Sequence, residues 1–520
     1  MGDYLTGDSH QGDCSPGQST RDTIGRRGRP ALANLPSSSP SCAVLKPPAT
    51  LPAEGRNSPW RPGFLSFGCV LLLYLVIGWK TSRNPYQHQF LSWYTSVVWT
   101  LPFLTSALGL TGVLVTARRV RGGRLITETP AAVTDLLLVV VPSIGREDTC
   151  PALERVLTSF GRHLPCLFPS MRVDLVVEED CVASERISRL AAAHEATEVR
   201  VVSIPREYQT PAGTRFKARA NHYAHELRIA QGEARENVWV LHMDDDTAVG
   251  ADTAQALARF IGAHGAAGKE ARHLAQGVLS FPRELSANRL IWLADAVRPG
   301  CDISIFAATT GLGSPRAGLH GELLLVRASV EASIGWDFGA SAIVEDAQFA
   351  LEFCARYPGS SDWIEGRSYG APPATLADFL RQRERWFWGL LRLATDRATP
   401  LRGRLVLLQA VAVWMCAPLQ HPVLVIGLGL MLHETSTGPV SVAIVPLWSV
   451  NFAFLFWLYW EGLKVNASAS ARTGRLWWEP VTLVLLLPVF SLWEGLGVAR
   501  GMLKFISRRD MTFTVIAKPA

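Results

Sequence analysis

Residues 238–247 read Val-Trp-Val-Leu-His-Met-Asp-Asp-Asp-Thr. The apolar run at 238–241 predicts a buried strand, and three acidic residues follow shortly after it. Ligands of parallel sheets bind at the carboxyl ends of the strands. Alternate residues of extended backbone point to the same side, so Asp244 and Asp246 form the expected pair. Carboxylates bind hard cations such as Mg²⁺ or Mn²⁺, which in turn hold phosphates, although a solvated acidic loop explains the three acids alone equally well.

The sequence around this stretch alternates apolar strands with helical segments. Strands are expected at 136–141, 173–177, 199–204 and 238–243, and helices at 216–231 and 253–263. This alternation is typical of an α/β domain whose mostly parallel sheet is covered by helices on both faces. We therefore expect one α/β domain over residues 130–400.

The composition argues against a wholly soluble protein. The 520 residues are 48% hydrophobic and only 18% charged, whereas soluble proteins contain about 25% charged residues. The same composition excludes a disordered or collagen-like chain. The net charge of +6 is modest, and no surface of interleaved basic and aromatic residues indicates a nucleic-acid partner.

Uncharged stretches on both sides of the α/β domain predict membrane segments, since about 20 apolar residues cross a bilayer. A transmembrane hairpin is expected over 64–117, and further segments over 405–500. The expected segments are about 64–79, 91–116, 405–433, 435–460 and 477–499. Two buried core helices are the alternative for the hairpin. The last segment is either a span or a re-entrant or interfacial helix.

The basic residues set the expected orientation. Four arginines between residues 118 and 124 follow the hairpin, which places the α/β domain in the cytosol by the positive-inside rule. Residues 1–63 are rich in Ser, Pro, Gly and Arg and predict a disordered cytosolic tail. Residues 501–520 predict a second cytosolic tail. We expect a multi-pass integral membrane protein. The high content of Ala, Gly and Arg is typical of a bacterial source, for which the membrane would be the plasma membrane.

Two further groups of polar residues follow the acidic stretch. Glu345 and Asp346 begin a helical segment, where a carboxylate either caps the helix or acts as a general base. Gln382, Arg385 and Trp386 share one helical face, because they are spaced i, i+3 and i+4. Gln and Arg donate to phosphate oxygens, and Trp offers a flat surface for a sugar ring. An amphipathic helix on the membrane surface explains the same residues, and both interpretations can hold together.

The combination of these features resembles the membrane-integrated inverting glycosyltransferases of family 2, such as cellulose, chitin and hyaluronan synthases. The shared order is a strand-end Asp-x-Asp, a Glu-Asp pair, a Gln-x-x-Arg-Trp element and membrane segments. Residues 210–223 and 364–389 resemble more closely the egghead family of β-1,4-mannosyltransferases. The resemblance implies a GT-A type nucleotide-sugar-binding domain inserted between transmembrane helices. It also implies transfer of mannose from GDP-mannose to a glucosyl lipid.

The resemblance implies a role for each candidate residue. Asp346 would be the general base, and Asp244 and Asp246 would hold Mg²⁺ or Mn²⁺ with the diphosphate. The residues expected to contact the nucleotide sugar are Glu179, Asp180, Lys217, Arg219, Asp244 and Asp245. The residues expected near the acceptor or the diphosphate are Gly321, Glu322, Glu345, Gln382, Arg385 and Trp386.

The expected reaction is a metal-dependent single displacement with inversion onto a lipid-linked or glycolipid acceptor in the membrane. The alternative is a processive polysaccharide synthase that uses a UDP-sugar and exports the glycan. A non-catalytic transporter or scaffold is a third hypothesis. It predicts broken motifs, whereas the acidic and basic elements of this sequence are intact.

Overall fold

The computed structural model describes residues 63–83, 100–123, 130–194, 197–265, 271–431, 445–471 and 478–509. The expected N-terminal tail up to residue 62 and the C-terminal tail from residue 510 lie outside these residues. So do residues 91–99 of the second expected membrane segment and residues 432–444, which include the start of the fourth.

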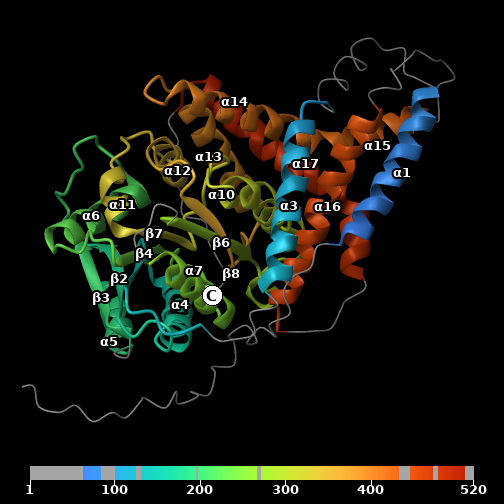
Figure 1. The fold of residues 1–520 in the computed structure, drawn as a ribbon. Helices are drawn as coiled ribbons and strands as arrows, with labels where there is room; N and C mark the ends of the chain where they lie inside the picture. Colours follow the sequence, from blue (N-terminus) through green and yellow to red (C-terminus); the bar gives the residue numbers. More distant parts are fainter. Residues whose placement is uncertain are drawn as a thin grey trace, which may run out of the picture. The chain divides into compact units, whose positions relative to one another are not determined.

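An eight-stranded sheet forms the centre of the α/β domain (Figure 1). Its strands are β1 (Leu136–Pro142), β2 (Met171–Glu178), β3 (Val199–Ile204), β4 (Val238–His242), β5 (Ala248–Val249), β6 (Leu274–Ser280), β7 (Leu324–Arg327) and β8 (Ser361–Tyr369). Their order is β3-β2-β1-β4-β7-β6-β8-β5. Strands β5 and β7 run antiparallel to their neighbours, and the others share one direction. The expected α/β fold with a mostly parallel sheet is confirmed.

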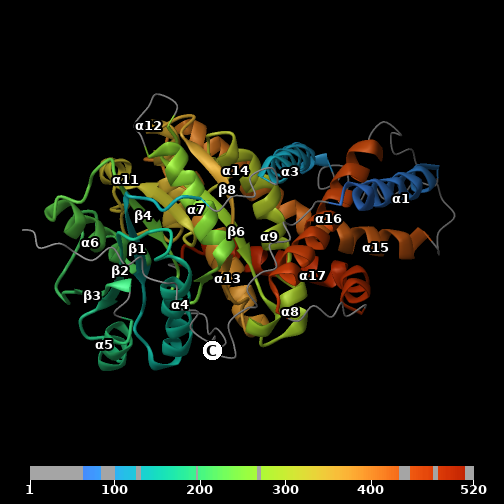
Figure 2. The ribbon, with the colours of Figure 1, turned by 60° about the horizontal axis from the view of Figure 1, so that its bottom comes forward.

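Helices cover both faces of the sheet. Successive side chains of each strand point to opposite faces, so a continuous apolar run places apolar side chains on both. These helices are α4 (Cys150–His163), α5 (Ser184–Ala192), α6 (Phe216–Ala230), α7 (Ala251–His264), α11 (Ala328–Ile334) and α12 (Glu345–Arg356). In β1, Leu137, Val139 and Val141 are buried against α4, α5 and α7. Leu138 and Val140 are buried on the opposite face with α6, α11 and α12 (Figure 2). The apolar runs seen in the sequence therefore form a sheet buried on both faces.

The carboxyl ends of β1, β2 and β4 meet at one edge of the sheet. These strands are parallel neighbours, and Val140 pairs with both Asp174 of β2 and His242 of β4. The residues that follow these strands therefore lie along the same edge. That edge includes the acidic stretch after β4.

A second group of helices contains the apolar segments. Their bounds are α1 (Phe64–Arg83), α3 (Phe103–Gly123), α14 (Leu401–Cys416), α15 (Gln420–Met431), α16 (Val445–Ala469) and α17 (Trp478–Ile506). In both views α1, α3, α15, α16 and α17 lie close to one another (Figures 1 and 2). Within the described part of the chain, two helical stretches are long and apolar enough to cross a membrane by length and composition, Leu401–Ile426 and Trp478–Ile506.

The last two apolar helices extend beyond the segments expected from the sequence. Helix α16 continues to Ala469, so Glu461 and Lys464 lie inside it and form an ion pair of 2.8 Å. Helix α17 is continuous over 29 residues, although Pro488 lies within it. Proline removes one backbone hydrogen bond of a helix, and here the helix continues on both sides of it.

Short helices join the sheet to the apolar helices. They are α8 (Arg289–Ala294), α9 (Val297–Cys301), the π-helical turn η4 (Asp302–Phe306) and α10 (Ala307–Gly311), together with the longer α13 (Leu376–Thr395). Arg383 of α13 forms buried ion pairs with Asp295 and with Glu494 of α17. Helices α9 and α16 cross backbone to backbone, because Gly300 and Gly462 face the partner helix at the crossing.

This crossing leads to a prediction about stability. A methyl group at position 462 would overlap the carbonyl oxygen of Ala296. Overpacking of this kind costs about 1–3 kcal/mol, so we expect Gly462→Ala to lower the melting temperature of the protein in detergent. Gly262→Ala on α7 is the matched control, since a methyl group there meets no atom within 4 Å. A melting temperature of Gly462→Ala at or above that of the control would contradict the close crossing.

Candidate active site

A cavity of about 1270 Å³ lies at the carboxyl edge of the sheet. Residues from the ends of β1, β2 and β4, from the first turn of α12 and from α13 line it. The cavity continues between the apolar helices, where Thr105 of α3, Val406 of α14 and Leu455 of α16 line it as well. The acidic edge and the apolar helices therefore share one cavity.

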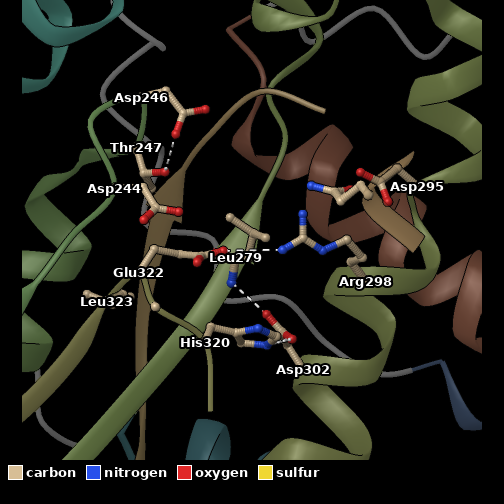
Figure 3. A network of polar contacts seen from close by, with 12 residues as sticks. Asp244, Asp246, Thr247, Leu279, Asp295, Arg298, Asp302, His320, Glu322 and Leu323 are labelled. Atoms are coloured by element: carbon tan, nitrogen blue, oxygen red, sulfur yellow. Dashed lines mark hydrogen bonds and ion pairs between the residues drawn. The ribbon is translucent and has the colours of Figure 1, made fainter. Parts of the chain in front are cut away.

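The three acidic residues after β4 have different partners. Asp244 forms an ion pair with Lys217 of α6. The carboxylate of Asp245 accepts a hydrogen bond of 2.6 Å from the Ser143 hydroxyl at the end of β1. The buried carboxylate of Asp246 is directed toward the hydroxyl of Thr247, 3.3 Å away (Figure 3). Asp244 therefore contacts a cationic side chain of the cavity.

Lys217 is fixed at the centre of the cavity. Besides Asp244, its ammonium group donates a hydrogen bond of 3.1 Å to the carbonyl oxygen of Gly321. Burial lowers the pKa of Lys217, but attraction by Asp244 and Glu345 outweighs this and holds the pKa above its usual value. A methyl group at position 321 would overlap the ammonium group of Lys217, so that a side chain there would require Lys217 to move. Lys217 therefore remains a cation at neutral pH.

Two residues beside this centre have unusual backbone angles. Phe216, directly before Lys217, has φ +59°, and Leu323, directly after Glu322, has φ +52°. Residues other than glycine rarely adopt positive φ, and such strain is concentrated at functional sites. Both conformations help to set where Lys217 and Glu322 lie.

Glu345 and Asp346 form the first turn of α12 and line the cavity. Burial, followed by repulsion from Asp346, raises the pKa of Glu345 to about 7. Burial also raises the pKa of Asp346, although attraction by Lys217 and His320 opposes this. One oxygen of Asp346 accepts the backbone N–H of Ala347 at 2.8 Å. The pair therefore holds a proton more readily than ordinary carboxyl groups do.

Helix α13 presents the Gln-x-x-Arg-Trp residues to the same cavity. The helix begins at the N-cap Thr375, whose hydroxyl accepts the backbone N–H of Asp378. Gln382, Arg385 and Trp386 all line the cavity. Burial lowers the pKa of Arg385, while attraction by Glu345, Asp244 and Asp346 opposes this. A guanidinium group and an indole thus lie opposite the acidic residues.

Arg298 of α9 links α13 to the loop before β7. Its guanidinium group lies 4.6 Å from the ring centre of Trp386 and 3.3 Å from the carboxylate of Glu322 (Figure 3). Burial and then repulsion from Asp244 raise the pKa of Glu322, and the charge of Arg298 opposes this. Arg298 could not be predicted from the sequence, because no local pattern surrounds it.

The structure brings nearly all the residues predicted for the site into the wall of this cavity. The exceptions are Glu179 and Asp180, which lie beyond the end of β2 next to Arg206. At the end of β2 the acid that lines the cavity is Glu178, whose carboxylate is held by Arg219 at 2.6 Å.

The oxygen atoms in the cavity suit a hard divalent cation. Asp244 offers carboxylate oxygens at the cavity wall, and such oxygens are the preferred ligands of Mg²⁺ and Mn²⁺. Over the described ranges, no group of three or more His, Cys, Asp or Glu side chains is arranged to hold a metal ion.

Comparisons with known proteins relate this chain to glycosyltransferases. Residues 239–460 match the family described as Glycosyl transferase family group 2. The β-1,4-mannosyltransferase egh of Drosophila melanogaster is 29% identical over 225 residues, which are 42% of this chain and 47% of the fly protein. The β-1,4-mannosyltransferase bre-3 of Caenorhabditis elegans is 27% identical over 61% of this chain and 67% of the worm protein.

Solved structures include a mannosyltransferase of Pyrobaculum calidifontis in complex with GDP-Man and Mn²⁺. It is 14% identical, with a TM-score of 0.43 over 79% of this chain and all of that one. The match to the fly relative spans about half of its length. The family match and the two relatives confirm the resemblance seen in the motifs. Residues 239–460 of this chain are thus similar to glycosyl transferase family group 2, and the chain is similar in sequence to β-1,4-mannosyltransferases.

Proposed function

We propose that this protein transfers mannose from GDP-mannose, with inversion, to the sugar of a lipid-linked acceptor in the membrane. The observation that carries the proposal is one cavity that contains Asp346, Lys217 and Asp244 and continues between apolar helices. The similarity to β-1,4-mannosyltransferases supports mannose as the transferred sugar. The arginine cluster between residues 118 and 124, which begins within α3, supports a cytosolic position of the α/β domain.

Asp346 is proposed as the general base. It accepts the proton of an acceptor hydroxyl while the oxygen of that hydroxyl attacks the anomeric carbon of mannose. The bond from this carbon to the diphosphate breaks, and its electron pair stays on the diphosphate. One displacement inverts the anomeric configuration, through a transition state similar to that of glycoside hydrolysis. Its raised pKa brings Asp346 closer to the working pH, as suits a general base.

Lys217 and Arg385 are proposed to stabilise the leaving diphosphate. The diphosphate gains negative charge as the bond breaks, so fixed cations stabilise the transition state more than the ground state. Glu178 at the end of β2 and Arg219 of α6 are proposed to contact the nucleoside in the same cavity. Trp386 offers its ring to the acceptor sugar.

A divalent cation fits this site beside Asp244, and Asp246 is the second proposed ligand. When bound, such a cation neutralises charge on the diphosphate. The ion pair with Lys217 holds the Asp244 carboxylate in place at the cavity wall.

The acidic pair at the start of α12 predicts a pH dependence. The base must be ionised, and the two neighbouring carboxyl groups titrate as a coupled pair, with the pKa of Glu345 raised to about 7. Because burial raises the pKa of Asp346, we expect kcat/KM to fall about tenfold per pH unit on the acidic side of the profile, beginning at a higher pH than for an ordinary Asp carboxyl group. In Glu345→Gln a negative neighbour is removed, so Asp346 ionises more easily and the acidic limb moves to lower pH. Initial rates between pH 5 and 9 measure this.

Glu352→Gln is the matched control for this profile. Glu352 lies on the same helix but pairs with Arg356 and does not line the cavity. It should leave the acidic limb where it is in the native protein. An unmoved limb in Glu345→Gln, or an equal movement in both variants, would show that the acidic pair does not set the profile.

Donor turnover tests the function itself. The purified protein would receive GDP-mannose, UDP-glucose or UDP-N-acetylglucosamine with Mn²⁺ or Mg²⁺ and a glucosyl lipid, and the released nucleoside diphosphate would be measured. We expect GDP release that requires both the lipid and the metal and that stops with EDTA. Release of UDP without lipid, with a growing polymer, would instead indicate a polysaccharide synthase. No release from any donor would overturn the proposal.

A further inference from the structure

His320, which precedes Gly321 in the cavity wall, is held in one orientation. Its Nε2 lies 2.5 Å from the carboxylate of Asp302, a residue with no exposed surface (Figure 3). The other oxygen of Asp302 accepts the backbone N–H of Leu279 at 2.8 Å. The backbone N–H of His320 donates to the side chain of Gln276 at 2.9 Å. Both the ring and the backbone of His320 are therefore fixed by buried partners.

This arrangement leaves one ring nitrogen for a ligand. Nε2 is bound to Asp302, and no side chain or backbone group of the described residues bonds Nδ1 of His320. The His320 side chain lines the cavity and keeps 15% of its surface exposed. Burial lowers the pKa of His320, but attraction by Asp302 outweighs this and raises it. The ring therefore presents Nδ1 to the cavity in a fixed position.

The pair lies far from the proposed nucleoside position. Asp302 and His320 are bound to Leu279 and Gln276 of β6, whereas Glu178 ends β2. Four strand spacings separate β2 from β6 in the sheet, which corresponds to roughly 19 Å at about 4.8 Å per spacing. The pair therefore belongs to the end of the cavity opposite the nucleoside.

The same end of the cavity adjoins the base and an apolar helix. The Phe306 ring lies 4.5 Å from the His320 ring, and both Phe306 and Ala347, the neighbour of Asp346, adjoin Gly318. Asp302 opens the π-helical turn η4, and π-helical turns occur frequently at functional sites. The next residue of this turn, Ile303, accepts a hydrogen bond of 3.2 Å from Thr116 of α3. An acceptor that comes from the membrane would meet this wall beside the base.

We propose that Asp302, His320 and Phe306 form the sugar-binding part of the acceptor site. The Nδ1–H group of His320 donates a hydrogen bond to a hydroxyl of the acceptor sugar, next to the hydroxyl that Asp346 deprotonates. Asp302 is a positioning residue that holds the ring through Nε2, and Phe306 packs against the sugar. This inference rests on the proposed function, since it assigns the place of the acceptor in that reaction.

Two variants of His320 separate this role from a structural one. The amide nitrogen of Asn can take the place of Nδ1, whereas that of Gln can take the place of Nε2. A ligand contact through Nδ1 predicts that His320→Asn binds the acceptor sugar within a few-fold of the native protein. It predicts binding about 10- to 100-fold weaker in His320→Gln. A purely structural contact to Asp302 through Nε2 predicts the opposite order.

The measurement is equilibrium binding of an alkyl β-glucoside with a fluorophore at the end of its chain, to protein in nanodiscs of phosphatidylcholine and phosphatidylglycerol. Phe306→Leu gives a second test that does not depend on the contact between His320 and Asp302. We expect this variant to bind the glucoside several-fold more weakly. Equal affinity of all variants, the opposite order of Asn and Gln, or no binding by the native protein would each overturn the inference. Native protein that binds the glucoside but transfers no sugar would contradict the proposed function. The affinities of the His320 variants would still test the inference about the sugar-binding residues.

Discussion

Asp346→Asn is expected to abolish sugar transfer and to leave binding of GDP-mannose unchanged. Asn has almost the same shape as Asp but accepts no proton at neutral pH. A general base contributes about 10²- to 10⁴-fold to the rate, so kcat should fall by that factor. The backbone N–H of Ala347 can still donate to the side-chain oxygen of Asn, so the start of α12 should stay intact. Steady-state transfer and equilibrium binding of GDP-mannose, measured on the same preparation, test both parts.

Asp396→Asn is the matched control for this variant. Asp396 follows α13, does not line the cavity, and accepts the backbone N–H of Ala398 at 2.9 Å, which Asn can also do. We expect native turnover from it. Turnover of Asp346→Asn within threefold of the control would show that Asp346 is not the base, whereas loss of donor binding would indicate a different role in the cavity.

Arg385→Ala is expected to lower kcat by about 10²- to 10³-fold, the usual effect of removing one fixed donor from a developing negative charge. Arg385 lines the cavity and attracts the carboxylates of Glu345, Asp244 and Asp346. Its contribution grows as the diphosphate leaves, so kcat should fall more than the affinity for GDP-mannose. The kcat of Arg385→Lys should lie between that of the native protein and that of Arg385→Ala, because Lys keeps the charge but not the planar fork of donors.

The rates of this variant need to be compared well above pH 7. Without Arg385 the pKa of Glu345 rises, so part of any loss at neutral pH would come from the acidic pair rather than from the leaving group. Arg392→Ala is the matched control, since Arg392 is an exposed arginine on the same helix that does not line the cavity. An Arg385→Ala variant with the same kcat as this control at high pH would exclude a role for Arg385 in departure of the diphosphate.

Local patterns were sufficient to predict several strands and helices of the α/β domain. Strands β1 to β4 and helices α6, α7 and α12 lie within a few residues of their predicted positions, because apolar runs and helical spacing are properties of neighbouring residues. The pair of Glu345 and Asp346 was found for the same reason. Strands β5 to β8 were not predicted, since their pairing depends on distant partners.

The position at which β2 ends decides which of two neighbouring glutamates lines the cavity. Glu178 is the last residue of β2, whereas Glu179 lies in the turn that follows, so their side chains point in different directions. Glu178 pairs with Ile204 in the sheet and meets Arg219, whereas Glu179 turns toward Arg206. The sequence Glu-Glu-Asp offers no means of choosing between these acids, because the choice depends on where β2 ends against β3.

The sequence by itself determined the α/β class, the acidic strand end, the acidic helix start, the Gln-x-x-Arg-Trp helix and the apolar segments. Each of these is encoded by residues that are close together in the chain, so spacing and polarity are sufficient to identify them. Only the tertiary structure placed Arg298, Asp302 and His320 around the same cavity. Burial and electrostatic attraction act between whatever side chains the fold brings within a few ångströms. Here the antiparallel β7 and the helices between β6 and β7 bring them together.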